Sequence, residues 1–410
     1  MPSAIILRYY TGRRARLRAF SLVLDRAMDP APRVAITGLG AWTPFGAGWA
    51  ALRSGLAAGR SALTRVGDRA PALPEAVAGL IHDLAPFRAA FPEVRPPLPI
   101  APTQIALVAA HEALTDAGLA EDPQREQIGV YLGRNRGPAG VVAKIMEAVL
   151  SGGAKKTSPL LFSQSVANAP LGAIAAHLVL RGPNLMTQGG GALLLALDAL
   201  RRGDAPALLV GGFEEIEAHC FAADAANGFI RPRCPADAIR PYDPTSAGPT
   251  FGEGAVFLAL EPLGRARARG ATIYAELCAA ESGLGAPLAG PSALAGWGSP
   301  TAEALLSLIQ AALRGAHLTP SRLDHHSGGG NGDPHLDALE RRALALLGRP
   351  DLPSTSPKGQ IGDGLGFGAV LAAALAADAL HRAAKSHALV THIEFHGALF
   401  AALLRRPEPA

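Results

Sequence analysis

The sequence predicts an α/β protein whose parallel strands are covered by helices on both faces. Short apolar strands alternate with segments of helical periodicity along most of the 410 residues, and strands separated in this way normally form parallel sheets. The 47 glycines and 34 prolines are spread between these segments, which indicates many tight turns rather than disorder. Aromatic residues make up only 5% of the chain, so Ala, Leu and Val must supply most of the core.

The first part of the chain opens with a predicted strand, Arg33–Gly40, which ends in glycines. A helix follows at Trp49–Gly59, with Leu52 and Leu56 on one face. The glycine turn at 38–40 lacks the spacing and the acidic residue of a dinucleotide site, so no such cofactor is predicted. The next elements alternate between helix and strand: helix Thr103–Ala117, strand Ile128–Gly133, helix Leu193–Arg202 and strand Ala207–Gly212.

The second part repeats this alternation. Its predicted elements are strand Ala255–Leu260, helix Leu263–Arg269, strand Thr272–Leu277, helix Thr301–Arg314 and the glycine-rich segment Ser327–Gly332.

The basic balance of the chain comes from its first 28 residues. They hold six arginines and one aspartate, a net charge of +5, whereas the whole chain carries +4. The body is therefore nearly neutral, and nucleic-acid binding is not predicted. Residues 1–28 lack the apolar core of a secretory signal. They form a basic extension that is either an arginine-rich targeting peptide or, as we favour, the product of a misassigned start codon upstream of Met28.

No stretch is predicted to span a membrane. The most apolar run, Ala369–Leu380, is shorter than the ~18 residues that a spanning helix needs, and it contains Asp378. The three cysteines, Cys220, Cys234 and Cys278, are odd in number and widely spaced, which indicates a reducing compartment and no metal site. A cytoplasmic protein is predicted.

A set of short motifs resembles the β-ketoacyl-acyl-carrier-protein synthase (ketosynthase) family. Each motif is common alone, but the order and spacing of the set are specific: Val34–Gly40, Gly182–Leu185, Val210–Glu214, Arg240–Asp243 and Phe251–Ala255. The resemblance implies a thiolase-like fold of five layers, α-β-α-β-α, built from two similar βαβαβαβ halves. We place these halves at residues 29–262 and 263–410. It implies neither a cofactor nor a metal.

A condensing synthase needs a cysteine thiolate at a helix N-terminus and two neutral histidines that hold an enolate oxygen. The matching nucleophile segment, Leu185–Leu193, has neither cysteine nor serine and is shorter than the family pattern. The missing nucleophile therefore falls between Gln188 and Gly191, and Gln188 is the preferred match. A turn residue that only hydrogen-bonds the backbone is the equal alternative for Gln188.

The family's first histidine motif matches His325–Asp333, and counting back from Asp333 places His325 at the histidine position. Adjacent side chains of an extended segment point in opposite directions, so at most one of His325 and His326 faces a pocket. A histidine outside the catalytic site is the favoured interpretation of both.

Lys358 matches the family's lysine, but Asp363 stands where the second histidine is expected. An unperturbed aspartate has a pKa near ~4, so at neutral pH it has no proton to donate and repels an enolate. We expect Lys358 and Asp363 to form a structural ion pair. The alternative is that burial keeps Asp363 protonated.

These departures are similar to those of chain-length factors, the inactive subunits that pair with an active ketosynthase in polyketide and related pathways. The resemblance implies a dimeric partner subunit of fatty-acid or polyketide biosynthesis that works with an acyl carrier protein, as a homodimer or with an active ketosynthase. One alternative is an acyltransferase or synthase with altered catalytic residues. Another is an ordinary condensing enzyme that uses Cys220 as its nucleophile.

Overall fold

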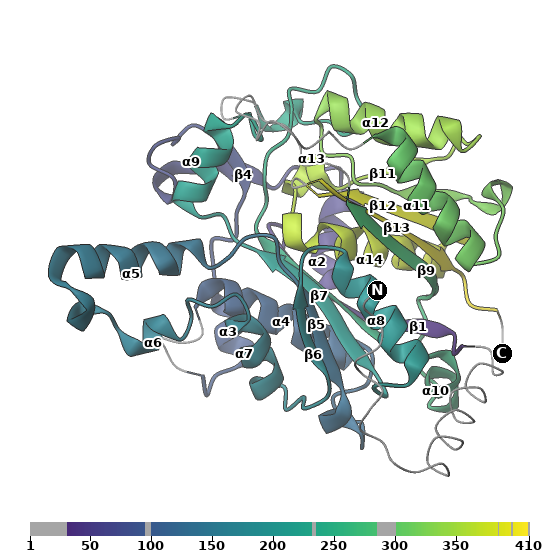
Figure 1. Ribbon diagram of the computed structural model, residues 1–410, viewed down its shortest axis with the longest axis horizontal. Coiled ribbons are helices and arrows are strands. Elements are labelled where there is room, and N and C mark those ends of the chain that lie inside the picture. Colours follow the sequence, from purple (N-terminus) through teal and green to yellow (C-terminus); the bar gives the residue numbers. More distant parts are fainter. Residues whose placement is uncertain are drawn as a thin grey trace, which may run out of the picture. The chain divides into compact units, whose positions relative to one another are not determined.

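The computed structural model describes residues 31–94, 100–231, 235–284, 301–383, 385–394 and 397–408. The predictions for residues 1–28 and for Cys234 lie outside these ranges. From Arg33 onward the chain forms one compact unit, and Figure 1 labels its elements.

Five strands from the first part of the chain form an array in the order β6-β5-β7-β8-β1. They are β1 (Val34–Thr43), β5 (Gly129–Gly133), β6 (Asn184–Thr187), β7 (Leu208–Glu214) and β8 (Gly254–Pro262). The strands β5, β6 and β7 are parallel, whereas β8 is antiparallel to both of its neighbours. A short strand, β2 (Gly46–Ala47), pairs with the end of β1, and β3 (Leu63–Arg65) pairs with β4 (Val77–Gly79) as a separate ribbon.

The second part of the chain repeats this arrangement in the order β11-β10-β12-β13-β9. Its strands are β9 (Ala275–Leu284), β10 (His325–Ser327), β11 (Ser354–Thr355), β12 (His387–Ile393) and β13 (Ala398–Arg405). When the five strands of each array are numbered in chain order, their order across the sheet is 3-2-4-5-1 in both arrays. In both, the fifth strand is antiparallel to its two neighbours. The predicted pair of similar halves is therefore confirmed. The arrays join where β1 also pairs with β9.

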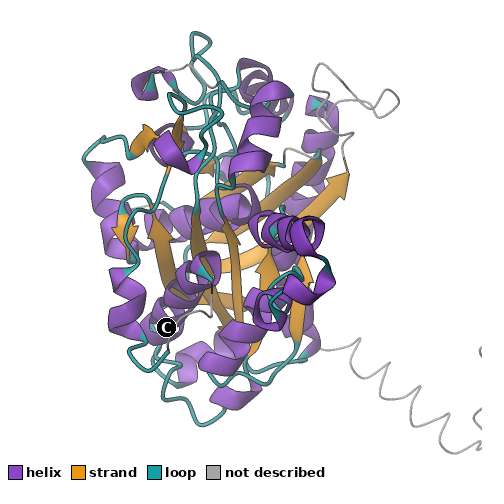
Figure 2. Cartoon of the chain, turned by 90° about the vertical axis from the view of Figure 1, so that its left-hand side faces the viewer, coloured by secondary structure: helices purple, strands orange, loops and turns teal. Residues whose placement is uncertain are grey.

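Helices complete the five predicted layers, and Figure 2 shows strands flanked by helices. On the outer face of the first array lie α4 (Ala101–Asp116) and α7 (Ala169–His177); on that of the second lie α11 (Ala302–Gly315) and α12 (Pro334–Leu346). Between the arrays, α2 (Trp49–Ala57), α8 (Gly191–Arg202) and α14 (Gly368–Arg382) share one core with strands of both.

The pleat of each strand separates these layers. Successive side chains of a strand face opposite sides of the sheet, and β8 divides accordingly. Its Val256 and Leu258 join the core between the arrays, whereas Ala255 and Phe257 join the core under α4. Both faces of the strand are thus buried, which explains why β8 reads as a continuous apolar run.

The remaining helices are shorter or lie at the edges of the unit. They are α3 (Ala85–Ala90), α5 (Ala139–Gly152), α6 (Pro159–Phe162), α9 (Ala218–Ala226), α10 (Leu263–Ala268) and α13 (Lys358–Ile361). Among the described residues, one segment, Leu365–Arg382, is long and apolar enough to cross a membrane by length and composition, but 72% of it is buried inside the protein. This segment contains α14, a helix of the central core.

Candidate functional site

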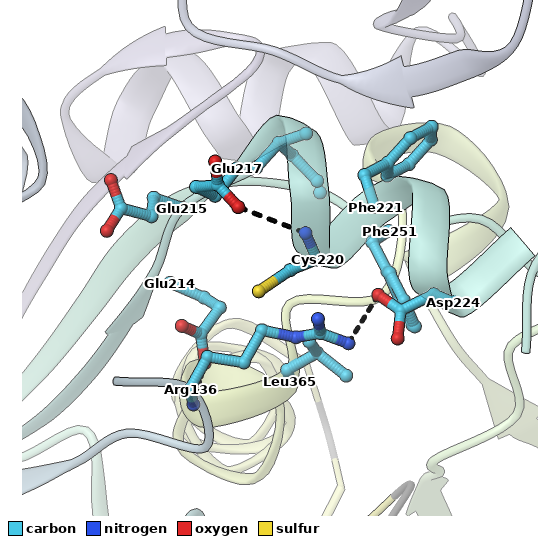
Figure 3. A pocket seen from close by; sticks show the side chains of 11 residues that line it. Arg136, Glu214, Glu215, Glu217, Cys220, Phe221, Asp224, Phe251 and Leu365 are labelled. Carbon is cyan, nitrogen blue, oxygen red and sulfur yellow. Dashed lines mark hydrogen bonds and ion pairs between the residues drawn. The ribbon is translucent and has the colours of Figure 1, made fainter. Parts of the chain in front are cut away.

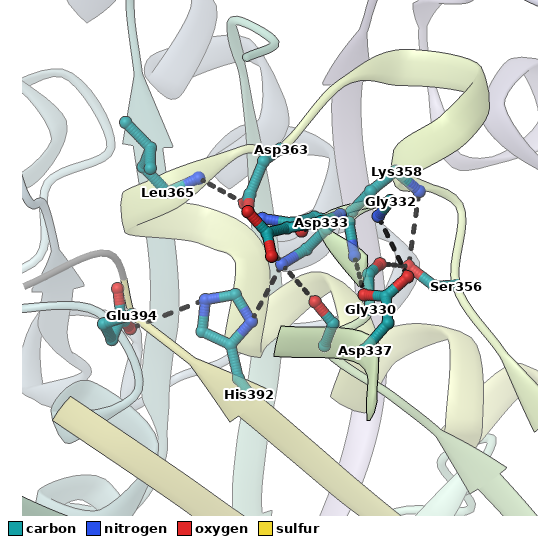
Figure 4. A network of polar contacts seen from close by, with 12 residues as sticks. Gly330, Gly332, Asp333, Asp337, Ser356, Lys358, Asp363, Leu365, His392 and Glu394 are labelled. Carbon is teal, nitrogen blue, oxygen red and sulfur yellow. Dashed lines mark hydrogen bonds and ion pairs between the residues drawn. The ribbon is translucent and has the colours of Figure 1, made fainter. Parts of the chain in front are cut away.

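The site is built around Lys358 and Asp363, which the chain brings together across the single turn of α13. Lys358 Nζ lies 3.0 Å from Asp363 Oδ2, and both side chains are buried. The predicted ion pair is therefore confirmed (Figure 4). Lys358 Nζ also donates to the carbonyl oxygen of Gly329 at 2.8 Å and lies 3.3 Å from His392 Nδ1. The side-chain amide of Asn331 donates to Asp363 at 3.1 Å.

The charge of Asp363 follows from these contacts. Burial acts to raise the pKa of its carboxyl, but the ammonium of Lys358, with His392 and the amide of Asn331, outweighs burial and leaves the pKa lowered. Asp363 is therefore a carboxylate at neutral pH. It accepts hydrogen bonds and has no proton to donate to an oxyanion.

Two further residues of the site, His392 and Glu394, come from the end of β12. His392 Nε2 lies 3.7 Å from Glu394 Oε1. Glu394 in turn accepts a hydrogen bond from the side-chain amide of Asn135 and one of 3.2 Å from the backbone N–H of Gly190. Gly190 is the residue before α8. A buried chain of polar contacts thus runs from Asp363 through Lys358 and His392 to Glu394 (Figure 4). The hydrogen bond from Gly190 to Glu394 extends it to the start of α8.

Glu394 fills the space beside the turn that joins β6 to α8. Gly189 in this turn has a φ of +40°, and a Cβ added there would lie 1.6 Å from Glu394 Oε1. Gln188, the residue preferred from the sequence, is exposed, whereas Gly189 is buried. A side chain at position 189 would therefore enter the buried network, and Glu394 already holds that volume.

The environment of Glu394 makes it a titratable group near neutral pH. Burial raises the pKa of its carboxyl to about 7, although the amide of Asn135 and the N–H of Gly190 act to lower it. Partial positive charge at a helix N-terminus favours the ionised form. Both protonation states of Glu394 are therefore accessible at neutral pH.

The two histidines of the glycine-rich motif lie outside this network. His326 lies 2.8 Å from Ser354 Oγ through Nδ1 and 2.6 Å from Thr391 Oγ1 through Nε2. His325 Nδ1 instead lies 3.0 Å from Lys385 Nζ. Neither histidine of this motif contacts Lys358 in these hydrogen bonds; the motif instead contacts Lys358 through the backbone carbonyl of Gly329. The structure thus places Lys358 and Asp363 together and leaves His325 and Gln188 apart from them.

Two carboxylates of α12 hold the glycine-rich loop in place. Asp337 accepts the backbone N–H groups of Asn331 at 2.9 Å and Gly332 at 3.2 Å. Glu340 accepts the N–H of Gly329 at 3.0 Å. Because both loop contacts to the ion pair come from Gly329 and Asn331, these carboxylates position the partners of Lys358 and Asp363.

Cys220, the alternative nucleophile, lies on α9 in a small cavity (Figure 3). Burial raises the pKa of its thiol, and the guanidinium of Arg136 offsets this only in part. The cavity holds about 10 Å³, enough for a single water molecule. Arg136 pairs across it with Asp224 at 2.6 Å. These surroundings favour a protonated thiol and leave no room for an acyl chain. No cluster of His, Cys, Asp and Glu in the described ranges is arranged to hold a metal ion.

Comparisons with known proteins agree with the motifs. Residues 31–266 match the family model described as "Beta-ketoacyl synthase, N-terminal domain". The 3-oxoacyl-[acyl-carrier-protein] synthase 2 of Coxiella burnetii is 29% identical over 324 residues, which cover 76% of each chain. The Staphylococcus aureus (strain N315) protein of the same name is 30% identical over 255 residues, and the match spans 59% of each chain.

Solved structures share the fold. The ishigamide ketosynthase/chain length factor has a TM-score of 0.78 at 24% identity, and the match covers 92% of this chain and all of that one. A β-ketoacyl synthase from Burkholderia phymatum STM815 has the same TM-score and coverage at 22% identity. The fold is thus that of the thiolase-like ketosynthases, and the chain belongs to the β-ketoacyl synthase family.

Proposed function

We propose that this chain is a catalytically silent, chain-length-factor-type subunit that pairs with an active ketosynthase. The observation that carries the proposal is the position of Glu394, whose carboxylate fills the space beside Gly189 at the start of α8. A condensing enzyme needs a thiolate at such a helix N-terminus and neutral donors around the developing oxyanion. Here the space holds a carboxyl group, and the neighbouring Asp363 is an anion paired with Lys358.

An exposed apolar surface supports the pairing. Val142, Met146 and Leu150 follow one another at the spacing of one face of α5 and are 42%, 51% and 81% exposed. Leu160 and Phe162 of α6 are 56% and 62% exposed. Apolar side chains gathered in this way commonly mark a protein–protein interface. In addition, β6 ends its array and, among the strands that the structure describes, pairs only with β5, so its other edge can pair with a second chain.

The neighbours in the comparison indicate which partners to test. One is named as a ketosynthase/chain length factor. Another, with a TM-score of 0.76 at 20% identity, is a type II polyketide synthase acyl-carrier protein in complex with its ketosynthase. By analogy we propose a ketosynthase and an acyl carrier protein as partners of this chain, in the cytoplasm.

Co-expression tests the pairing. The chain is co-expressed with a ketosynthase that retains its Cys-His-His set and the mixture is separated by size-exclusion chromatography. A complex of one copy of each is expected, and Leu150→Lys should weaken it because a charge is buried at the interface. Leu346→Lys, at an exposed leucine of α12, is the matched control and should leave the complex intact. Persistent separate homodimers would contradict the proposal.

An activity assay tests whether the chain lacks condensing activity of its own. The purified chain, incubated with acyl and malonyl carrier protein, is expected to form no 3-ketoacyl product, and unaided product formation would refute this part of the proposal.

One observation favours the alternative, an acyltransferase or synthase with altered catalytic residues. Glu394 has a pKa of about 7 and lies beside His392, and a carboxyl with that pKa can exchange protons at neutral pH. Malonyl turnover that Glu394→Gln abolishes would support this function.

A further inference from the structure

A cavity of about 570 Å³ opens beside β11, on the side where α13 and α14 approach it. Leu56, Leu375 and Ala379 supply apolar walls, and His325 and Lys385 also line it. The side chains of Lys358, Asp363 and Glu394 do not line this cavity, so it is separate from the buried network. Its volume falls within the range of small-molecule sites, which are commonly apolar with a few fixed polar groups.

The charged side chain that lines the cavity is positive. Among the described residues that line it, Lys385 is the only lysine or arginine, and none is an aspartate or glutamate. Within the described ranges Lys385 also forms no ion pair with a carboxylate; its contact is to the His325 ring. Polar side chains such as Tyr242, Ser356 and Gln360 line the rest of the cavity. A half-buried ammonium in a cavity lined by no described carboxylate attracts an anion.

His325 fixes the orientation of this ammonium. Lysine has only donors, so the 3.0 Å contact makes Lys385 Nζ the donor and His325 Nδ1 the acceptor. The ring proton then resides on Nε2. Burial, together with the charge of Lys385, lowers the pKa of His325 to about 4, so the ring stays neutral at physiological pH. Since His325 is its one hydrogen-bond partner among the described residues, the ammonium of Lys385 keeps two further N–H groups for a ligand.

We infer that this cavity binds a small anionic molecule with an apolar body, a medium-chain carboxylate, whose carboxylate pairs with Lys385 and whose hydrocarbon chain packs against Leu56, Leu375 and Ala379. This assigns His325 a role as the positioning residue of Lys385. The inference does not rest on the proposed function, because it holds whether or not the chain condenses acyl groups.

Isothermal titration of the full-length protein with octanoate tests the site. Saturable binding is expected, and octanol and octylamine should bind more weakly because they lack the negative charge. Lys385→Met should weaken octanoate binding about tenfold to a hundredfold, the effect of losing a charge-assisted hydrogen bond. Lys385→Arg should retain most of the affinity. Lys144→Met, which removes an exposed lysine of α5, is the matched control and should change nothing.

A second variant tests the apolar wall without touching the charge. Leu375→Trp places a much larger side chain against the apolar wall and should weaken octanoate binding, while urea unfolding shows that the protein remains folded. Absence of saturable octanoate binding to the wild-type protein would overturn the inference. So would equal affinities for octanoate and octylamine, or equal octanoate affinities for wild-type protein and Lys385→Met.

Discussion

Replacing Glu394 with glutamine should flatten the dependence of stability on pH. Burial raises the pKa of this carboxyl from 4.5 to about 7, and unfolding returns it to its ordinary value. Between these two values the folded protein binds more protons than the unfolded chain. The stability contributed by Glu394 is therefore fully present below the unfolded pKa and is lost as pH rises through the folded pKa.

The size of the effect follows from the two pKa values. Each pKa unit corresponds to about 1.4 kcal/mol, so between about pH 5 and about pH 8 the wild-type protein should lose about 2.5 kcal/mol through Glu394. Glu394→Gln cannot lose this contribution. Its free energy of unfolding should therefore fall less over the same interval, whatever the substitution does to stability at pH 5.

Urea unfolding of both proteins at several pH values between these limits measures the difference. Glu214 provides the matched control, because burial also raises the pKa of its carboxyl to about 7 although its hydrogen bonds come from the backbone of Asn135 and Arg136. Glu214→Gln should flatten the profile by a similar amount. If wild type and Glu394→Gln lost the same free energy while Glu214→Gln lost less, the reasoning about Glu394 would be refuted.

Three further predictions follow from the site. Lys358→Met should cost about 3–5 kcal/mol in urea unfolding because it leaves Asp363 buried and unpaired; a second change, Asp363→Leu, should recover part of this, and a loss that persists in full would argue against the ion pair. Gly189→Ala should cost about 1–3 kcal/mol through overpacking, and the cost should shrink in a Glu394→Ala background; equal costs in both would mean that Glu394 does not hold that volume. Because its pKa is raised, Cys220 should react with iodoacetamide more slowly than free cysteine at about pH 8, as followed by mass spectrometry, and faster labelling would revive it as a nucleophile.

Elements with strong periodicity could be predicted from the sequence, and weakly patterned ones could not. The helix predicted at Thr103–Ala117 is α4, Ala101–Asp116, because its apolar residues recur at helical spacing. The strand predicted at Thr272–Leu277 instead spans Ala275–Leu284. Its second half mixes small and polar residues, and pairing with β13 makes it a strand. Long-range pairing of this kind leaves little local signal.

Some residues of the candidate site could likewise be predicted from the sequence, and others could not. Lys358 and Asp363 could be predicted because they lie in one motif, five residues apart along the chain. His392 and Glu394 were missed because only the pairing of β12 with β10 brings them near that motif. A signal was present, since Glu394 is an acidic residue directly after a strand whose middle, Ala388–Val390, is apolar. The run of glycines after Gln188 left the register open, and the positive φ of Gly189 is visible only in the folded chain.

The helices α8 and α14 have a consequence for how this chain can be divided. Strands of both arrays enclose them in one shared core, so a fragment that ended between β8 and β9 would expose apolar surface that the other fragment normally covers. The duplicated topology therefore describes two copies of a pattern but one cooperative unit of folding. Neither copy is an independent domain, and expression of either alone should yield an aggregating polypeptide.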